Sequence, residues 1–280
     1  MILIADSGSS KTDWALVDQN GLVQLIETVG LNPDFHSDES ILKEVGSVAA
    51  HLDSIPKEVQ FYGSGASSES RKLPIKNALE RTFKDAKVHV AHDLLGAARA
   101  TLGNQKGLVG ILGTGSNCSA YDGNRITKEF RSGGYILSDE GGGVYMGKQL
   151  LKAFIEDQLE DALKQNFTTE FDLDVDKILQ KIYKESMPNR FIASFSEFIY
   201  RHQANPQIQG IIEANFNAFF EEKVCRFDDH QNLPLGVVGS IANHFKSHLE
   251  SAAKKYNCNL EVVVSKPIDA LVSFHQAKLG

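Results

Sequence analysis

Apolar residues in the first third of the chain follow patterns that alternate between strands and helices. Short apolar runs bounded by turn residues, at 2–5 and 14–17, predict two buried strands joined as a hairpin. Three more strands are predicted at 21–29, 59–62 and 87–91. Helical spacing of apolar residues predicts helices at 38–52, 74–83 and 94–102. Strands that alternate with helices indicate an α/β domain with a partly parallel sheet.

A second series of elements begins at residue 108 and repeats the opening pattern. Predicted strands at 108–112 and 118–121 enclose a turn of small residues, Gly113–Asn117, and an acidic turn at Asp122–Asn124 follows. This order repeats that of the first hairpin and indicates a weak internal duplication. The remaining predicted elements are helices at 149–163, within 164–230, at 240–255 and at 267–279, and strands at 235–238 and 260–264.

The turn of the first hairpin combines a carboxylate, small residues, hydroxyls and a lysine. These residues are Asp6, Gly8, Ser9, Ser10, Lys11 and Thr12. Consecutive backbone N–H groups in such a turn form a concavity that binds anions, and the hydroxyls and the lysine add donors for phosphate. A carboxylate at the end of a strand suits Mg²⁺, usually through water. An ordinary tight hairpin with a polar tip has the same composition, so both interpretations stand at this point.

Two common phosphate motifs do not fit these turns. In the first turn, Ser10 precedes Lys11-Thr12, and Ala5 occupies the first glycine position of a P-loop. That turn also leads into a strand, whereas a P-loop leads into a helix. The second turn lacks the third glycine of the dinucleotide-binding pattern, where Cys118 stands. The two turns therefore predict a phosphate hairpin of a different design.

The composition of the chain argues against several classes of function. The chain has 280 residues, enough for one large or two ordinary domains. Its net charge of −7 argues against nucleic acid or an anionic membrane as partner. The three cysteines have no C-x-x-C spacing, which argues against a zinc site, an iron–sulfur cluster or a disulfide framework. With no signal peptide and no apolar run of transmembrane length, a cytoplasmic protein is expected.

Five segments, taken together and in order, carry a resemblance to a known family. They are Asp6–Thr12, His92-Asp93, Gly113–Asn117, Asp139-Glu140-Gly141 and Gly236–Ala242. The set resembles the sugar kinase/actin/Hsp70 ATPase superfamily, and more narrowly the BadF/BadG/BcrA/BcrD ATPase family with its N-acetylglucosamine kinase branch. The resemblance spans nearly the whole chain. It implies two ribonuclease H-like domains with a cleft between them, the first at 1–104 plus the closing helix 267–280, the second at 105–266.

The resemblance implies that Asp93 is the general base for the acceptor hydroxyl. A carboxylate suits phosphoryl transfer, which needs positioning more than a strong base. A helix N-cap is the structural alternative for this aspartate. By the same resemblance, ATP with Mg²⁺ is the cofactor, Asp6 is the metal ligand, and Gly239-Ser240 approaches the adenosine. The ATP-binding residues are Gly8, Ser9, Ser10, Lys11, Thr12, Gly113, Thr114, Gly115, Ser116, Asn117, Gly239 and Ser240.

The implied sugar-binding residues lie on loops with hydroxyl, amide and carboxylate groups. They are Asn32, Ser64, Asp93, Ser132, Gly133, Gly134 and Asp139. Two positions depart from the family pattern. Gly133-Gly134 stands where Trp-Gly is usual, which removes an aromatic wall beside the acceptor. Ala270 stands where the family has a late glycine near adenine.

The implied function is ATP-dependent phosphorylation of a hexosamine, most favourably N-acetylglucosamine at O6. Glucosamine and N-acetylmuramic acid are alternative acceptors. Two other classes stay open: an ATPase that activates a dehydratase system, and a sugar-sensing domain without catalysis. The expected partners are a sugar and ATP, with no nucleic acid and no membrane, and association into a homodimer stays open.

Overall fold

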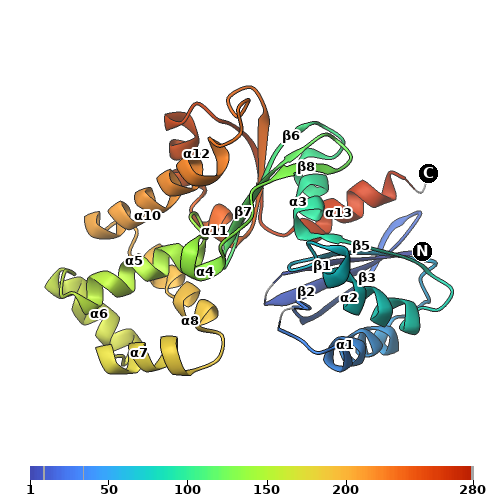
Figure 1. The fold of residues 1–280 in the computed structure, drawn as a ribbon, viewed down its shortest axis with the longest axis horizontal. Coiled ribbons are helices and arrows are strands. Elements are labelled where there is room, and N and C mark those ends of the chain that lie inside the picture. The colour runs from blue at the N-terminus through green and yellow to red at the C-terminus, as the bar shows by residue number, and fades with distance from the viewer. Residues whose placement is uncertain (9, 34, 279–280) are drawn as a thin grey trace. The chain divides into compact units, whose positions relative to one another are not determined.

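The computed structural model describes residues 1–8, 10–33 and 35–278, and within them the chain divides into two compact units. Unit 1 comprises Met1–Val109, Tyr121–Ile126 and Lys266–Gly280, and unit 2 comprises Gly110–Ala120 and Thr127–Ser265. Each unit is built on a five-stranded sheet covered by helices (Figure 1). Ser9, one of the residues expected to bind ATP, lies outside the described residues.

The sheet of unit 1 has the strand order β3-β2-β1-β4-β5. Its strands are β1 (Ile2–Ser7), β2 (Lys11–Asp18), β3 (Gly21–Val29), β4 (Glu58–Gly63) and β5 (Lys87–His92). The first three pair antiparallel as consecutive hairpins, whereas β4 pairs parallel with β1 and β5 parallel with β4. The predicted mixed sheet is therefore confirmed, and the carboxyl ends of β1, β4 and β5 lie at one edge.

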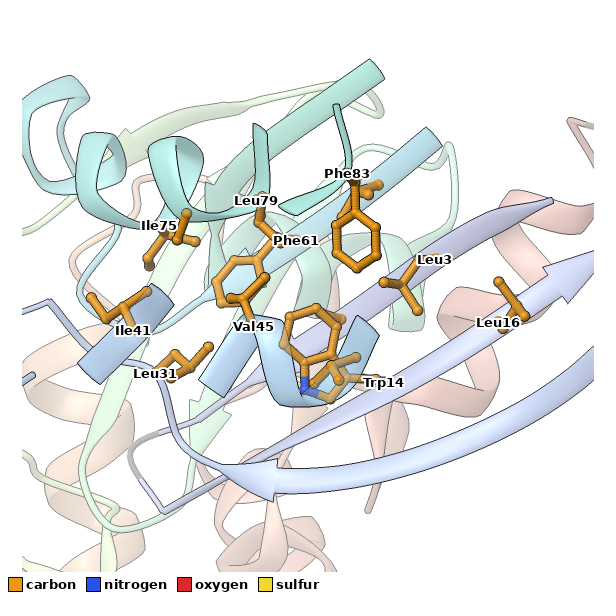
Figure 2. Packing of buried hydrophobic residues seen from close by; sticks show 14 residues of the cluster. Leu3, Trp14, Leu16, Leu31, Ile41, Val45, Phe61, Ile75, Leu79 and Phe83 are labelled. Atoms are coloured by element: carbon orange, nitrogen blue, oxygen red, sulfur yellow. The ribbon is translucent and has the colours of Figure 1, made fainter. Parts of the chain in front are cut away.

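Continuous apolar runs in β1 and β2 follow from burial on both faces of this sheet. Leu3 and Ala5 point to one face, where Trp14 packs on Phe61 with ring centroids 5.7 Å apart. Figure 2 shows this core, in which side chains of helices α1 (Asp38–His51) and α2 (Glu69–Thr82) meet those of the strands. Ile2 and Ile4 point to the opposite face. Successive side chains of a strand point to opposite faces of the sheet. A strand buried on both faces therefore has apolar residues at consecutive positions instead of alternating apolar and polar ones.

The second face of the sheet is covered by α3 (Asp93–Leu102) and the last helix, α13 (Pro267–Gln276). A buried polar chain joins them. The hydroxyl of Tyr62 lies 2.7 Å from Nε2 of His275 and accepts a hydrogen bond of 2.5 Å from Arg99. Because that oxygen already accepts from a guanidinium, we assign its own proton to the hydrogen bond with the histidine, whose Nε2 is then unprotonated. Burial, then the charge of Arg99, lowers the pKa of His275 to about 4.

The sheet of unit 2 repeats the topology of the first. Its order is β10-β9-β6-β7-β8, which is the order of unit 1 read from the other end. The strands are β6 (Gly107–Leu112), β7 (Ser116–Tyr121), β8 (Ile126–Glu129), β9 (Pro234–Val238) and β10 (Asn259–Val264). The hairpin of β6 and β7 thus occupies the position of β1 and β2, as the internal duplication predicts.

Helices make up most of unit 2 between β8 and β9. They are α4 (Gly134–Leu137), α5 (Gly143–Ile155), α6 (Asp161–Phe171), α7 (Val175–Lys184), α8 (Pro188–Ser194), α9 (Ser196–Arg201), α10 (Pro206–Phe219) and the π-helix η1 (Phe220–Val224). Two more, α11 (Ser240–His244) and α12 (Lys246–Lys255), separate β9 from β10. Phenylalanines of these elements are buried and form part of their core, among them Phe195, Phe198, Phe216, Phe219 and Phe220. Among the described residues, no helix has the length and apolar character that crossing a membrane requires.

Three predicted helix boundaries are wrong, each for a local reason. The helix predicted from Pro74 begins at Glu69, because the hydroxyl of Ser68 caps it by accepting a bond from the Arg71 amide. The helix predicted at 149–163 is two helices, interrupted where Asp157 adopts a left-handed conformation. The helix predicted at 240–255 breaks at Phe245, whose side chain is buried.

Candidate functional site

Three carboxylates gather at the carboxyl edge of the unit 1 sheet. Asp6 and Asp13 face each other in the register of β1 and β2, and Asp93 follows β5 directly. Burial, followed by the charges of Asp93 and Asp13, raises the pKa of Asp6 to about 7, while the Lys11 ammonium opposes the rise. The parallel register of β1, β4 and β5 places Asp6 and Asp93 at the same edge of the sheet, two strands apart. Oxygen ligands with excess negative charge are what a divalent cation such as Mg²⁺ requires.

Asp93 is not the N-cap of α3. The helix begins at Asp93 with His92 in the capping position, and no side chain forms a capping bond there. One oxygen of the Asp93 carboxylate lies 3.2 Å from Nε2 of His92, and about a fifth of the Asp93 side chain is exposed (21%). The structural alternative raised from the sequence is therefore not realised, and the carboxylate stays accessible at the edge of the sheet.

The turn between β1 and β2 is held by bonds of its own. The Gly8 amide donates to the Lys11 carbonyl at 2.9 Å, and the Lys11 ammonium pairs with Asp13 at 2.9 Å and with Glu27 at 3.0 Å. The hydroxyl of Thr12 is buried and donates to the Val29 carbonyl at 3.0 Å. It therefore fixes the turn from inside the unit. Ser10 is exposed at the tip of the turn.

Sequence reasoning missed Ser7 and Gly65, which bring the Asn32 loop to this turn. The Ser7 hydroxyl accepts a bond of 2.9 Å from the Leu31 amide, and the Ser7 carbonyl accepts one of 2.8 Å from the Ser64 amide. A Cβ atom on Gly65, whose φ is +80°, would lie 2.4 Å from Oδ1 of Asn32. Asn32 itself is buried. Only glycine permits this close approach, and a glycine after a predicted strand was the available signal.

The turn between β6 and β7 in unit 2 is fastened to the start of α5. The amides of Gly143 and Val144 donate to the carbonyls of Gly113 and Thr114, at 2.8 and 2.9 Å. In the part of the chain that the structure describes, no acceptor takes the amide hydrogens of Thr114 and Gly115. Unpaired amides in a rigid turn are donors for an anion.

Ser116 and Asn117, also expected to bind ATP, are engaged within unit 2. The Ser116 hydroxyl donates to the Glu140 carbonyl at 2.6 Å, and its amide donates to the Asp139 carboxylate at 3.3 Å. The side-chain Nδ2 of Asn117 donates to the Glu129 carboxylate at 2.9 Å. These contacts fix the conformation of the turn between β6 and β7, called the second polar turn below.

Asp139, expected beside the sugar, lies against the second polar turn. A Cβ on Gly115 would be 2.7 Å from its carboxylate, and Asp139 has a φ of +71°. Burial raises the pKa of Asp139, against which the Ser116 amide and the Lys223 ammonium act. Lys223, which sequence reasoning missed, is itself buried, contacts Ser138, and pairs with Glu140 at 3.1 Å. Its ammonium offsets part of the negative charge of Asp139 and Glu140. Ser132, Gly133 and Gly134 are exposed.

Gly239 brings the end of β9 to the same turn. Its φ is +121°, and a Cβ there would lie 2.2 Å from the Leu112 carbonyl oxygen and 3.3 Å from the Gly113 nitrogen. Ser240 is exposed at the start of α11. The expected nucleotide residues of unit 2 therefore share one edge of its sheet, because β6 and β9 are neighbours there.

Two sheets of one strand order, each with a polar turn after its first strand, define the actin-like ATPase fold of sugar kinases. A Porphyromonas gingivalis protein provisionally assigned as an N-acetylglucosamine kinase matches with 34% identity, 99% of both chains covered and a TM-score of 0.94. A Chromobacterium violaceum protein with the same provisional assignment matches at 16% identity, 98% of both chains and a TM-score of 0.75. A ROK family glucokinase from Streptomyces griseus, in complex with glucose and AMPPNP, shares the fold at 14% identity, 99% and 100% coverage and a TM-score of 0.61.

The chain belongs to the BadF/BadG/BcrA/BcrD ATPase family, whose model matches residues 5–212. The resemblance drawn from the five sequence segments is thereby confirmed. A comparison with curated proteins finds no match.

Proposed function

We propose that the protein is a kinase that transfers the γ-phosphoryl group of ATP to a hexosamine, with O6 of N-acetylglucosamine as the preferred acceptor. Family membership and the relative of 34% identity support this proposal. The observation that carries it is the Asp93 carboxylate, which makes no helix-capping bond and is accessible at the sheet edge that also carries Asp6.

Asp93 acts as the general base in this proposal. It accepts the proton of the sugar hydroxyl as that oxygen bonds to the γ-phosphorus and the bond from phosphorus to the β,γ-bridging oxygen breaks, leaving ADP. The His92 ring, 3.2 Å away, orients the carboxylate. A positioned carboxylate is sufficient because phosphoryl transfer depends mainly on alignment and on charge stabilisation.

ATP is bound by the two polar turns in this proposal. In unit 2, the free amides of Thr114 and Gly115 donate to phosphate oxygens, and Gly239 and Ser240 approach the adenosine. In unit 1, Gly8, Ser10 and Lys11 supply the turn. Gly113, Thr12, Ser116 and Asn117 support the turns through the bonds described above.

The donor set around Asp6 fits Mg²⁺. A partly buried carboxylate whose pKa is raised by burial and by two other carboxylates gains most from a hard cation. Asp6 would hold the ion, with Asp13 and Asp93 nearby. When bound, Mg²⁺ neutralises charge on the phosphate oxygens.

The sugar contacts proposed from the resemblance are Asn32, Ser64, Asp93, Ser132, Gly133, Gly134 and Asp139. Asn32 has the strongest support, because Gly65 packs directly against its side chain and fixes its place. The structure supports a different role for Asp139. Its carboxylate accepts a hydrogen bond from the Ser116 amide and so stabilises the second polar turn, and the Lys223 ammonium favours its charged form.

A panel of sugars in a coupled assay of ADP release tests the proposal. We expect the highest kcat/KM with N-acetylglucosamine, and mass spectrometry of the product should place the phosphate on O6. Faster turnover of glucosamine or N-acetylmuramic acid would reassign the acceptor. ATP hydrolysis that no sugar accelerates would contradict a kinase and favour the ATPase of a dehydratase system, whose iron–sulfur cluster an absorbance spectrum of anaerobically purified protein would reveal. Absence of any turnover would favour a sugar sensor.

A further inference from the structure

Three groups that commonly bind transition metals converge in unit 2, outside the residues discussed so far. They are the thiols of Cys225 and Cys258 and the ring of His230. One ligand atom from each lies within 4.8 Å of the other two. In tetrahedral zinc sites, sulfur and nitrogen ligands lie about 2.0–2.3 Å from the ion, so a small contraction would let all three reach one ion. We infer that Cys225, His230 and Cys258 form a binding site for Zn²⁺, a site separate from the proposed Mg²⁺ site.

The hydrogen bond made by the His230 ring leaves its other nitrogen for a metal ion. Its Nδ1 lies 2.9 Å from the Phe227 carbonyl oxygen. A carbonyl only accepts hydrogen bonds, so Nδ1 carries the proton, and Nε2 of the neutral ring keeps its lone pair. Histidine ligands of zinc commonly donate their second ring N–H to a backbone carbonyl, which sets both tautomer and orientation. A disulfide between the two cysteines would not require the His230 ring beside them.

The backbone of each of the three ligand residues is fixed by a hydrogen bond. The Cys225 amide donates to the Phe220 carbonyl at 2.8 Å at the end of η1, and the Cys258 amide donates to the Ala253 carbonyl at 2.9 Å after α12. The His230 amide donates to the Phe227 carbonyl at 3.1 Å. Three separately anchored turns therefore present the ligands, which lowers the cost of ordering them around an ion.

The ligand set selects the ion by charge and by softness. Two thiolates and a neutral imidazole suit Zn²⁺, and binding expels the two thiol protons, so the site becomes neutral overall. The fourth position is left for water. The ion would join the end of η1, which carries Lys223, to the turn before β10. Its role is therefore to brace the part of unit 2 that holds the Asp139-Glu140 pair.

The test uses the full chain, made metal-free under a phosphine reductant that keeps its thiols reduced. Zn²⁺ is titrated against a chromophoric chelator, and Co²⁺ serves as a spectroscopic probe. We expect one equivalent of each ion, with Co²⁺ giving thiolate charge-transfer absorption and the intense visible bands of tetrahedral coordination. Cys225→Ser, Cys258→Ser and His230→Gln should each weaken Zn²⁺ binding at least about tenfold. The controls Cys118→Ala and His244→Gln, which lie outside the cluster, should bind as the wild type does.

Failure of the metal-free wild type to bind Zn²⁺ or Co²⁺ would overturn the inference, and this result does not depend on whether the variants fold. Binding that persists unchanged in all three ligand variants, with native circular dichroism, would overturn it as well. Reduced protein that binds no metal but loses two thiols to an intramolecular disulfide on oxidation would reassign the pair to redox chemistry. Sugar kinase activity is not a readout here, so failure of the proposed function leaves this test intact.

Discussion

Acidification should destabilise unit 1 through His275. The ring is buried, accepts a hydrogen bond from Tyr62, and faces the positive charges of Arg99 and Lys278 and the ring of His89. Protonation would remove the acceptor at Nε2 and add a third cation to this group. The folded pKa of about 4 lies below the value of 6.5 for an unperturbed histidine. The unfolded chain therefore binds the proton more readily, and the free energy of unfolding falls as pH drops from 6.5 towards 4.

The size of the effect follows from these two pKa values. Linkage gives a loss of about 2 kcal/mol at pH 5 and about 3 kcal/mol once the pH is below both values. For a chain of this size, the loss at pH 5 corresponds to a Tm lowered by roughly 3–4 °C. Other groups titrate over the same range, so the relevant quantity is the difference between the wild type and His275→Gln, which has no proton to gain.

Urea unfolding followed by tryptophan fluorescence at pH 7.5 and at pH 5 measures this difference. Trp14 is the single tryptophan of the chain and is buried in the core of unit 1, so its emission reports on that unit. The wild type should lose about 2 kcal/mol more than His275→Gln on acidification. His51→Gln, an exposed histidine in the same unit, is the matched control and should keep the wild-type pH dependence. Equal losses in the wild type and His275→Gln would refute the reasoning.

Three further predictions concern the proposed site. Asp93→Asn should lower kcat about 10²–10⁴-fold while calorimetry shows ATP still bound, and unchanged turnover would remove Asp93 from the mechanism. Asn32→Ala should raise the sugar KM more than the ATP KM in steady-state kinetics, and the opposite pattern would reassign that loop. Gly239→Ala should weaken ATP binding and lower the Tm, because its Cβ would lie 2.2 Å from the Leu112 carbonyl oxygen. Gly210→Ala, in open space on α10, is its control and should bind ATP normally, so equal behaviour of the two variants would contradict the steric argument.

Local patterns in the sequence were sufficient for most of the strands. The runs at 2–5 and 14–17 are apolar at every position, and that at 108–112 is interrupted only by Gly110, which is typical of strands covered on both faces. The small-residue turns that follow them were visible for the same reason: glycine, serine and threonine interrupt an apolar run. Helix ends were less predictable, because Ser68 and Phe245 act through a capping bond and through burial that only the folded chain provides.

The sequence by itself therefore determined most of the strands, the duplicated hairpin and the order of the polar segments, since these depend on neighbours along the chain. Tertiary structure alone decided which distant residues meet. Strand order places Asp6 and Asp93 at one edge of a sheet, the buried Lys223 ammonium pairs with Glu140, and three turns bring Cys225, His230 and Cys258 together. The number of residues between two positions does not predict such contacts. The packing of helices and strands against one another decides which residues distant in sequence lie close in space.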